Sequence, residues 1–411
     1  MELILHFRPA GHEYAPDLPT PSSNKGPLSF LVSLMVNRED LFDEGRADPG
    51  TLMSVEHDLF RRNPESTDGS RLWTCLPEQV RAAIKLRADG EIWLKIASGM
   101  PSVDNLPWEL AGQAAAMELG RPVRVSRFVP VRLPPAPALT ATLPVRILIV
   151  VTNPKDEQLL DSNREVYALR AGIDSNQYEV QVLQEATADS AAAVMQFFQP
   201  HVLHYVGHSG ANRGSGYLVL HDPNRGTTEW VGADDIAKAL PVSVRVGCLS
   251  TCFTQQNYDV TGLALFAHAP ATVRLPTMVI NRFGIDEKAV QTFWRVFYEQ
   301  MITAGGNVAA ALVAGQQATA AAEPNSLNWA SFSLVARDGG DQPLHIGQQR
   351  DAGQFASEVQ AQFASRLAAD LADKLRAFSP SSQSESLTRS LSEAQQRVRE
   401  YTKRISKRVT E

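Results

Sequence analysis

Short, continuous apolar runs alternate with helical patterns through the middle of the chain. The runs VRILIVV, YEVQVLQ and HVLHYV begin at Val145, Tyr178 and His201, and each has the length and apolar continuity of a strand buried on both faces. Between them, the spacing of apolar positions predicts helices over 161–173 and 187–198. Strands and helices that alternate at this pitch indicate βαβ units and a mainly parallel sheet.

The alternation continues toward residue 340. The expected elements are, in order, a small hairpin over 214–231, a helix over 233–240, a strand ending near Cys252, a helix over 260–269, a strand over 277–281, two helices within 286–322 and a strand over 328–336. We therefore predict an α/β domain over residues 140–340, whose sheet has about six strands and carries helices on both faces.

The segments on either side of this domain have different patterns. Residues 1–135 mix apolar runs with Pro-rich stretches, which predicts an N-terminal α/β region that ends in a Pro-rich connection. Residues 351–411 place apolar side chains at four-residue steps and then, from Leu387 to Ile405, in a 4-3-4-3-4 spacing, so a C-terminal helical extension is expected. This extension is either a solvated helix folded on the core or an arm that recruits an activator or a second copy of the chain.

Composition narrows the class of protein. The 411 residues are 44% hydrophobic and 20% charged, which is the composition of an ordinary globular protein with a sizeable core. A net charge of −6 gives no reason to expect a nucleic acid as a partner, and no apolar run is long enough for a membrane span. Three cysteines are too few for a disulfide framework or a zinc site, so we expect a protein without metal or cofactor in a reducing cytoplasm.

Two reactive side chains follow neighbouring strands of the predicted sheet. His208 comes directly after the run HVLHYVG, and Cys252 follows the run that contains Cys248, about 44 residues later. Because ligands bind beyond the carboxyl ends of parallel strands, we expect the imidazole and the thiol to face one site. A thiol beside an imidazole is the minimum apparatus for thiolate nucleophilic catalysis. Cys248 is expected to be a small buried residue, and His201 and His204 to be structural.

These motifs resemble the CHAT domain, a bacterial branch of the caspase and separase group of cysteine peptidases. The resemblance rests on HVLHYVGHSG as the histidine motif, CLSTC as the nucleophile motif, the segment that begins PTMVINRFGIDEKAV, the closing NWASFSLVA and the upstream NLPWEL. It covers roughly residues 100–338 and implies a caspase-like sheet. Caspases place their histidine about 50 residues before the cysteine, which is consistent with the interval here. For Trp108 and Glu109 of NLPWEL we expect a packing corner with a satisfied carboxylate.

The resemblance implies a role for each residue of the site. Cys252 would attack the scissile carbonyl as a thiolate, and His208 would promote its ionisation and protonate the departing amine. The backbone N–H groups of Cys252 and of Ser209, where caspases have Gly, would hold the oxyanion. Ser250 stands where relatives shape the pocket for the P1 residue. Asp286 stands where the family often has Asp and is a candidate for the same pocket, but a helix N-cap is at least as good an interpretation of it.

The function that follows is a cysteine endopeptidase of the CHAT family. The resemblance implies that it cuts a specific protein partner as a regulated effector in bacterial defence or cell death, with an activating or sensor protein as a second partner and self-association through the C-terminal helices as an option.

Two alternatives stay open. GHSGA also resembles the nucleophile elbow of α/β-hydrolases, which would make the chain a serine esterase with Ser209 as its nucleophile and His268 or His345 as its histidine. The second alternative is a catalytically silent scaffold of the same fold, which binds partners through its C-terminal helices.

Overall fold

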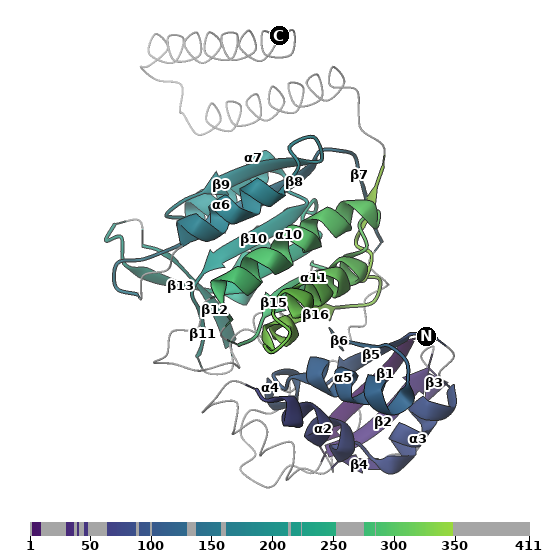
Figure 1. Cartoon of the computed structure of the whole chain (residues 1–411). Helices are drawn as coiled ribbons and strands as arrows, with labels where there is room; N and C mark the ends of the chain where they lie inside the picture. Colours follow the sequence, from purple (N-terminus) through teal and green to yellow (C-terminus); the bar gives the residue numbers. More distant parts are fainter. Residues whose placement is uncertain are drawn as a thin grey trace, which may run out of the picture. The chain divides into compact units, whose positions relative to one another are not determined.

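The computed structural model describes most of the chain up to residue 347. The described residues are 2–9, 30–36, 39–40, 45–47, 64–87, 90–98, 101–129, 137–157, 162–212, 215–222, 224–251, 275–283 and 285–347 (Figure 1). They all belong to one compact unit, Met1–Gly347. The predicted C-terminal helices (351–411) and the predicted helix over 260–269 lie outside the described residues, as do Cys252 and His268.

The described residues of this unit form one mixed sheet of 12 strands. Its strands, in spatial order, are β3 (Glu39–Asp40), β2 (Phe30–Val36), β1 (Glu2–Pro9), β5 (Ile92–Ala97), β6 (Val123–Phe128), β16 (Phe332–Ala336), β15 (Thr277–Asn281), β14 (Val246–Thr251), β10 (Val202–Gly207), β8 (Val145–Val151) and β9 (Tyr178–Leu183), with β4 (Gly45–Ala47) beside β2. Strands from the first part of the chain form one half of the sheet, and strands from the second part form the other. The halves meet at β6 and β16, which are parallel and pair Arg127 with Val335 and Phe128 with Ala336.

The second half of the sheet corresponds to the six strands expected from the sequence. β15, β14, β10, β8 and β9 are parallel to their neighbours in this set, and β16 is antiparallel to β15. Every residue of β14 and β15 is buried. Burial on both faces explains why these strands are continuous apolar runs rather than alternating ones. The prediction of an α/β fold with a mainly parallel sheet is confirmed.

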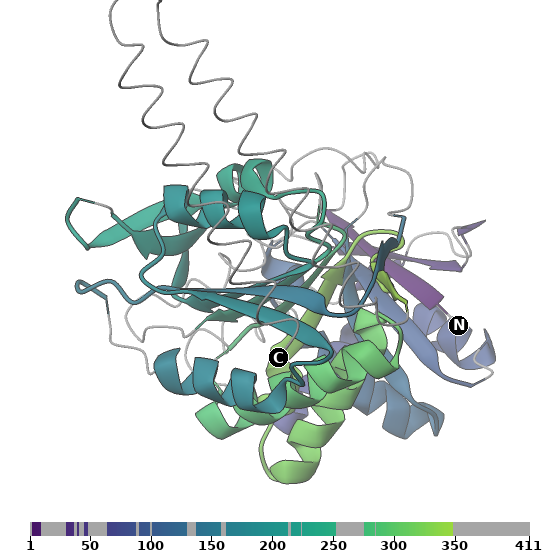
Figure 2. The ribbon, with the colours of Figure 1, turned by 90° about the horizontal axis from the view of Figure 1, so that it is seen from above.

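Helices cover both faces of this half, as predicted. The helices and the remaining short elements are α6 (Ser162–Gly172), α7 (Ala188–Phe198), α8 (Ala233–Ala239), α10 (Glu287–Thr303), α11 (Val308–Ala322), η1 (Asn328–Ser331), the three-stranded sheet of β11 (Ser209–Asn212), β12 (Ser215–His221) and β13 (Thr228–Gly232), and the pair β7 (Leu139–Ala141) and β17 (Leu344–Ile346). Helices α6, α10 and α11 share one apolar cluster with the sheet, and α7 and α8 share the other, so the two groups lie on opposite faces (Figure 2).

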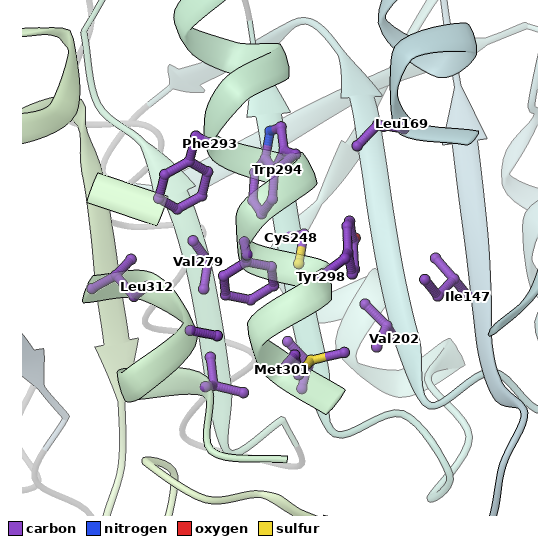
Figure 3. Packing of buried hydrophobic residues seen from close by; sticks show 14 of the residues in the cluster. Ile147, Leu169, Val202, Cys248, Val279, Phe293, Trp294, Tyr298, Met301 and Leu312 are labelled. Atoms are coloured by element: carbon purple, nitrogen blue, oxygen red, sulfur yellow. The ribbon is translucent and has the colours of Figure 1, made fainter. Parts of the chain in front are cut away.

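Helix α10 supplies the largest buried side chains of its face. Phe293, Trp294, Phe297, Tyr298 and Met301 recur at helical spacing and are buried. Figure 3 shows Phe293, Trp294, Tyr298 and Met301 packed against the sheet. Removing a buried aromatic ring from such a core typically costs about 3–5 kcal/mol. This packing fixes α10 on the strands that carry the candidate site.

The first half of the sheet has its own apolar core. Helices α2 (Ser66–Cys75), α3 (Glu78–Arg87), α4 (Pro101–Asp104) and α5 (Trp108–Leu119) lie in this part of the chain, and residues of α2, α3 and α5 pack in one cluster with β1, β5 and β6. Gly69 of α2 lies against the backbone of Leu110 in α5, where a Cβ atom would collide. Close contact of the two helices therefore requires glycine at this position.

The structure places two boundaries differently from the sequence prediction. The expected final strand over 328–336 begins with the 3-10 helix η1, and its strand part is only Phe332–Ala336. The expected hairpin is confirmed as β12 and β13, but β11 adds a third strand directly after His208. Within the described ranges, no helix is both long enough and apolar enough to cross a membrane.

Candidate functional site

The carboxyl ends of β10 and β14 lie side by side at one edge of the sheet. These strands are parallel neighbours, and their register pairs Gly207 with Thr251 as the last residues of the ladder. The next residue after β10 is His208, and the next after β14 is Cys252, which lies outside the described residues. The two strands that precede His208 and Cys252 are therefore adjacent and parallel, and their last residues pair with each other. This is the end of the sheet at which the sequence predicts an imidazole and a thiol.

The backbone of His208 is held by Tyr205 and by β12. The carbonyl oxygen of His208 accepts hydrogen bonds from the Tyr205 hydroxyl at 2.6 Å and from the Val219 N–H at 3.0 Å. The Tyr205 hydroxyl also lies 3.0 Å from Oγ1 of Thr152. A side chain at Gly207, the last residue of β10, would collide with both hydroxyl groups, so their close approach to the strand needs glycine. His208 itself is 3% exposed.

The end of β14 is held by a side chain of β15. The Thr251 N–H donates to Oδ1 of Asn281 at 2.9 Å, and Nδ2 of Asn281 donates to the Thr251 carbonyl at 2.7 Å. Both residues are buried. The backbone ladder between these strands ends at the pair Leu249 and Ile280, so it stops two residues before Thr251. The Asn281 carboxamide thus continues the pairing up to the residue that precedes Cys252.

Ser250 is a buried residue of β14 and is linked to a carboxylate on α6. Burial raises the pKa of Glu165 to about 7, a hydrogen bond with Ser250 opposes that rise, and the charge of Glu287 adds to it. Oε1 of Glu165 is buried and has no hydrogen-bond partner. A carboxyl group that titrates near neutral pH therefore lies beside the strand that leads to Cys252.

Asp286 and Ser209 lie in contrasting surroundings. Asp286 is the N-cap residue of α10 and is exposed; its Oδ2 accepts a hydrogen bond from Asn328 Nδ2 at 2.9 Å, and its side chain makes no capping hydrogen bond. Ser209 opens β11, so the serine is followed by a strand. A nucleophile elbow needs a sharp strand-to-helix turn at the serine, and the described residues do not have one there.

The NLPWEL segment forms a buried corner bound by two arginines. Glu109 accepts hydrogen bonds from Arg127 and from Ser333, and the Trp108 indole N–H donates to the Val103 carbonyl. The guanidinium group of Arg282 donates to three carbonyl oxygens of the corner, those of Asp104 (2.9 Å), Asn105 (2.8 Å) and Leu106 (2.6 Å). The expectation of a packing corner with a satisfied carboxylate is confirmed.

A family model for the CHAT domain matches residues 67–338. The chain belongs to the CHAT domain family. The resemblance expected from the motifs is confirmed, and the match begins upstream of them, so this CHAT domain includes α2, α3 and α5 as well as the six-stranded half of the sheet.

Solved structures similar to this CHAT chain include two crystal structures of the Saccharomyces cerevisiae separase–securin complex. The one at 3.0 Å has a matching chain with 15% identity and a TM-score of 0.35, over 67% of this chain and 17% of that chain. The one at 2.6 Å gives 14% identity and a TM-score of 0.37, over 68% and 18%. This chain therefore spans less than a fifth of the chains that it matches. No curated protein matches it.

The other cysteine and histidines near the site of this CHAT domain have structural roles, as expected. Cys248 is fully buried, and burial raises the pKa of its thiol to about 12. Burial lowers the pKa of His204 to about 3, and its Nδ1 lies 2.7 Å from the Tyr298 hydroxyl. Nδ1 of His201 accepts from the Arg146 N–H at 3.1 Å. Among the described residues of the chain, no cluster of His, Cys, Asp or Glu is arranged to hold a metal.

The sequence did not predict a role at the site for three residues that lie near it: Tyr205, Asn281 and Glu165. Tyr205 and Asn281 lie within apolar runs that indicate only buried strands, and Glu165 lies on an amphipathic helix among other polar residues. Their partners in this CHAT domain come from other elements of the fold, so local periodicity does not reveal them. The sequence offered one signal, a carboxamide at Asn281 directly after three apolar residues of a buried strand.

Proposed function

We propose that this CHAT domain is a cysteine endopeptidase in which Cys252 is the nucleophile and His208 is the general base and acid. One observation carries the proposal: the register that pairs Gly207 with Thr251 supports a short distance between the residues that follow them. Cys75 and Cys248 are buried, which makes them poor candidates for a reactive thiol. This and membership of the CHAT family support Cys252 as the nucleophile.

The proposed reaction follows the chemistry of thiol peptidases. His208 accepts the Cys252 proton, and the thiolate attacks the scissile carbonyl carbon. Backbone N–H groups of Ser209 and Cys252 stabilise the oxyanion, and His208 then protonates the departing amine. Water attacks the thioester with His208 as base, which releases the carboxylic acid product and restores the thiol.

The proposed substrate is a protein, and its P1 residue contacts Ser250 and Asp286. The proposal includes control by an activating or sensor protein and a role in bacterial defence or cell death in the cytoplasm. The C-terminal extension (351–411) is proposed to recruit that activator or a second copy of the chain. Removing residues 351–411 tests this last part, because unchanged oligomeric state and unchanged regulated cleavage would contradict it.

The deciding experiment is proteolysis of the proteins encoded beside this one, with the cut site determined by mass spectrometry. Cleavage by the wild type and loss of cleavage in Cys252→Ala are expected, whereas Cys248→Ala, a change at the buried cysteine of β14, is expected to keep cleavage if it folds. Undiminished cleavage by Cys252→Ala would overturn the proposal. If Ser209→Ala abolished cleavage and Cys252→Ala did not, a serine hydrolase with Ser209 as its nucleophile would replace the cysteine peptidase as the proposed function.

If the wild-type protein cleaves none of these proteins, the rate of alkylation of Cys252 is measured instead. Iodoacetamide should modify Cys252 at neutral pH faster in the wild type than in His208→Ala, because only the wild type has a base beside the thiol. Equal alkylation rates together with no cleavage would favour the catalytically silent scaffold.

A further inference from the structure

We propose that Asn281 is a positioning residue for the reaction: its carboxamide sets the direction of the Cys252 N–H that stabilises the oxyanion. This inference rests on the proposed function and concerns the same site. It is carried by the pair of hydrogen bonds between Asn281 and the backbone of Thr251.

The two hydrogen bonds use both halves of one amide group. Oδ1 accepts from the Thr251 N–H at 2.9 Å and Nδ2 donates to the Thr251 carbonyl at 2.7 Å. A carboxamide presents an acceptor and a donor side by side in one plane without carrying a charge, which matches the N–H and the carbonyl of one residue. Thr251 is 1% exposed and Asn281 is 4% exposed, so water does not compete for these bonds. The side chain therefore fixes the orientation of the last residue of β14.

The position of the carbonyl matters for the next residue. A peptide unit is planar and trans, so the direction of the Thr251 carbonyl determines the opposite direction of the Cys252 N–H. That N–H is one of the two proposed oxyanion donors. Asn281 acts on it only through the Thr251 carbonyl, which makes it a positioning residue rather than a catalytic one.

Asn281 is itself held on a rigid support. Its backbone pairs with Phe332 of β16, and the Arg282 N–H donates to the Ser331 carbonyl at 3.0 Å. The Arg282 guanidinium binds the carbonyls of the NLPWEL corner. Strand β15, which carries Asn281, is thus hydrogen-bonded to β16 on its side away from β14. The position of β15 therefore sets the orientation of Thr251.

Asn281→Asp tests this inference because it removes only the donor. The carboxylate still accepts from the Thr251 N–H but repels the Thr251 carbonyl. With a peptide substrate we expect kcat to fall about 10- to 100-fold with KM changed by less than about 3-fold, because the loss affects the oxyanion rather than substrate binding. Lower pH should partly restore kcat relative to wild type, since a protonated Asp again offers a donor.

Alkylation separates positioning from general damage to the site. Iodoacetamide reacts at a saturated carbon and forms no oxyanion, so the rate of Cys252 alkylation in Asn281→Asp should stay within about 3-fold of wild type. The matched control is Asn307→Ala, which removes the side chain that accepts from the Ala310 N–H at the start of α11. It should lower stability and leave kcat unchanged.

The outcomes distinguish this inference from the proposed function. Unchanged kcat in Asn281→Asp, or parallel losses of kcat and alkylation, would overturn the positioning role while leaving the peptidase intact. Wild-type protein with neither cleavage nor enhanced alkylation would instead overturn the peptidase. If Asn281→Asp does not fold, Asn281→Ser, which keeps a small donor, is measured by the same two assays and should retain more activity than Asn281→Ala.

Discussion

At the scale of single residues, Glu165 makes the stability of the fold depend on pH. Burial raises the pKa of Glu165 to about 7, so the folded state binds this proton more tightly than the unfolded state does. The stabilisation is complete below the pKa of an unfolded glutamate, about 4.3, and is lost as the pH rises through 7. Above pH 7 the folded protein must either keep the Glu165 carboxylate ionised with its buried Oε1 beside Ser250, or take up a proton where the proton concentration is low.

Glu165→Gln should remove this dependence because the amide is uncharged at every pH. We expect the variant to be more stable than wild type at pH 8.5 by about 2 kcal/mol and to lose that advantage at pH 5. Urea unfolding at both pH values measures the difference. Asp286→Asn is the control, since that carboxylate is exposed and should show little change. A constant difference between wild type and Glu165→Gln across this range would contradict the assigned pKa.

The candidate site was only partly predictable at this scale. His208 was predicted as a site residue because it follows a strand in a motif with chemical meaning, and the described part of the chain pairs the last residue of that strand, Gly207, with Thr251. Asn281 and Tyr205 act on backbone atoms of residues in other elements, and nothing in a local sequence pattern records such a contact. The sequence therefore located the edge of the sheet but not the hydrogen bonds that hold it.

At the scale of elements, the contact of α10 with α11 depends on a glycine. Gly315 of α11 lies where a Cβ atom would be 2.7 Å from the Phe293 ring. In an exposed helix, alanine would be favoured over glycine by about 1 kcal/mol. Here the collision costs more, because overpacking of a well-packed core typically costs about 1–3 kcal/mol. The two effects have opposite signs, and the packing term should dominate.

Gly315→Ala should therefore destabilise the fold by up to about 2 kcal/mol despite its better helix propensity. Thermal or urea unfolding measures the change. Gln317→Ala, at an exposed position of the same helix, is the matched control and should be neutral or slightly stabilising. A stabilising Gly315→Ala would mean that the helices separate easily at this contact.

Periodicity identified α10, α11 and the strands of the second half because their apolar patterns are long and regular. It did not identify β11 or η1, because each has four residues, too few for a periodic signal. It also gave no indication that the N-terminal strands extend the same sheet. Pairing of β6 with β16 joins distant residues, and only the tertiary fold brings these together.

At the scale of the whole molecule, the two halves of the sheet are joined by a short ladder and buried polar contacts. Arg127 and Glu109 come from the first half and Ser333 from the second. The side chains of Arg127 and Glu109 are 1% and 2% exposed. Breaking such a buried pair by removing one partner leaves an uncompensated charge, which typically costs about 3–5 kcal/mol.

Glu109→Ala should therefore lower stability by about 3 kcal/mol or more. Glu91→Ala is the matched control, since Glu91 pairs with Arg124 at 2.9 Å on the surface and should contribute less than about 1 kcal/mol. Urea unfolding of both variants gives the comparison. Similar losses for the two would show that the buried pair is worth no more than an exposed one.

The junction between β6 and β16 also has a consequence during synthesis of the chain. Ser333 is 224 residues from its partner Glu109, so the first half of the sheet leaves the ribosome long before β16 is made. Until then β6 presents an unpaired strand edge, which is a template for association with other chains. Nascent chains, and fragments that end before Phe332, are therefore expected to need a chaperone or to aggregate. β16 is synthesised last of these strands, and its pairing with β6 removes the exposed strand edge.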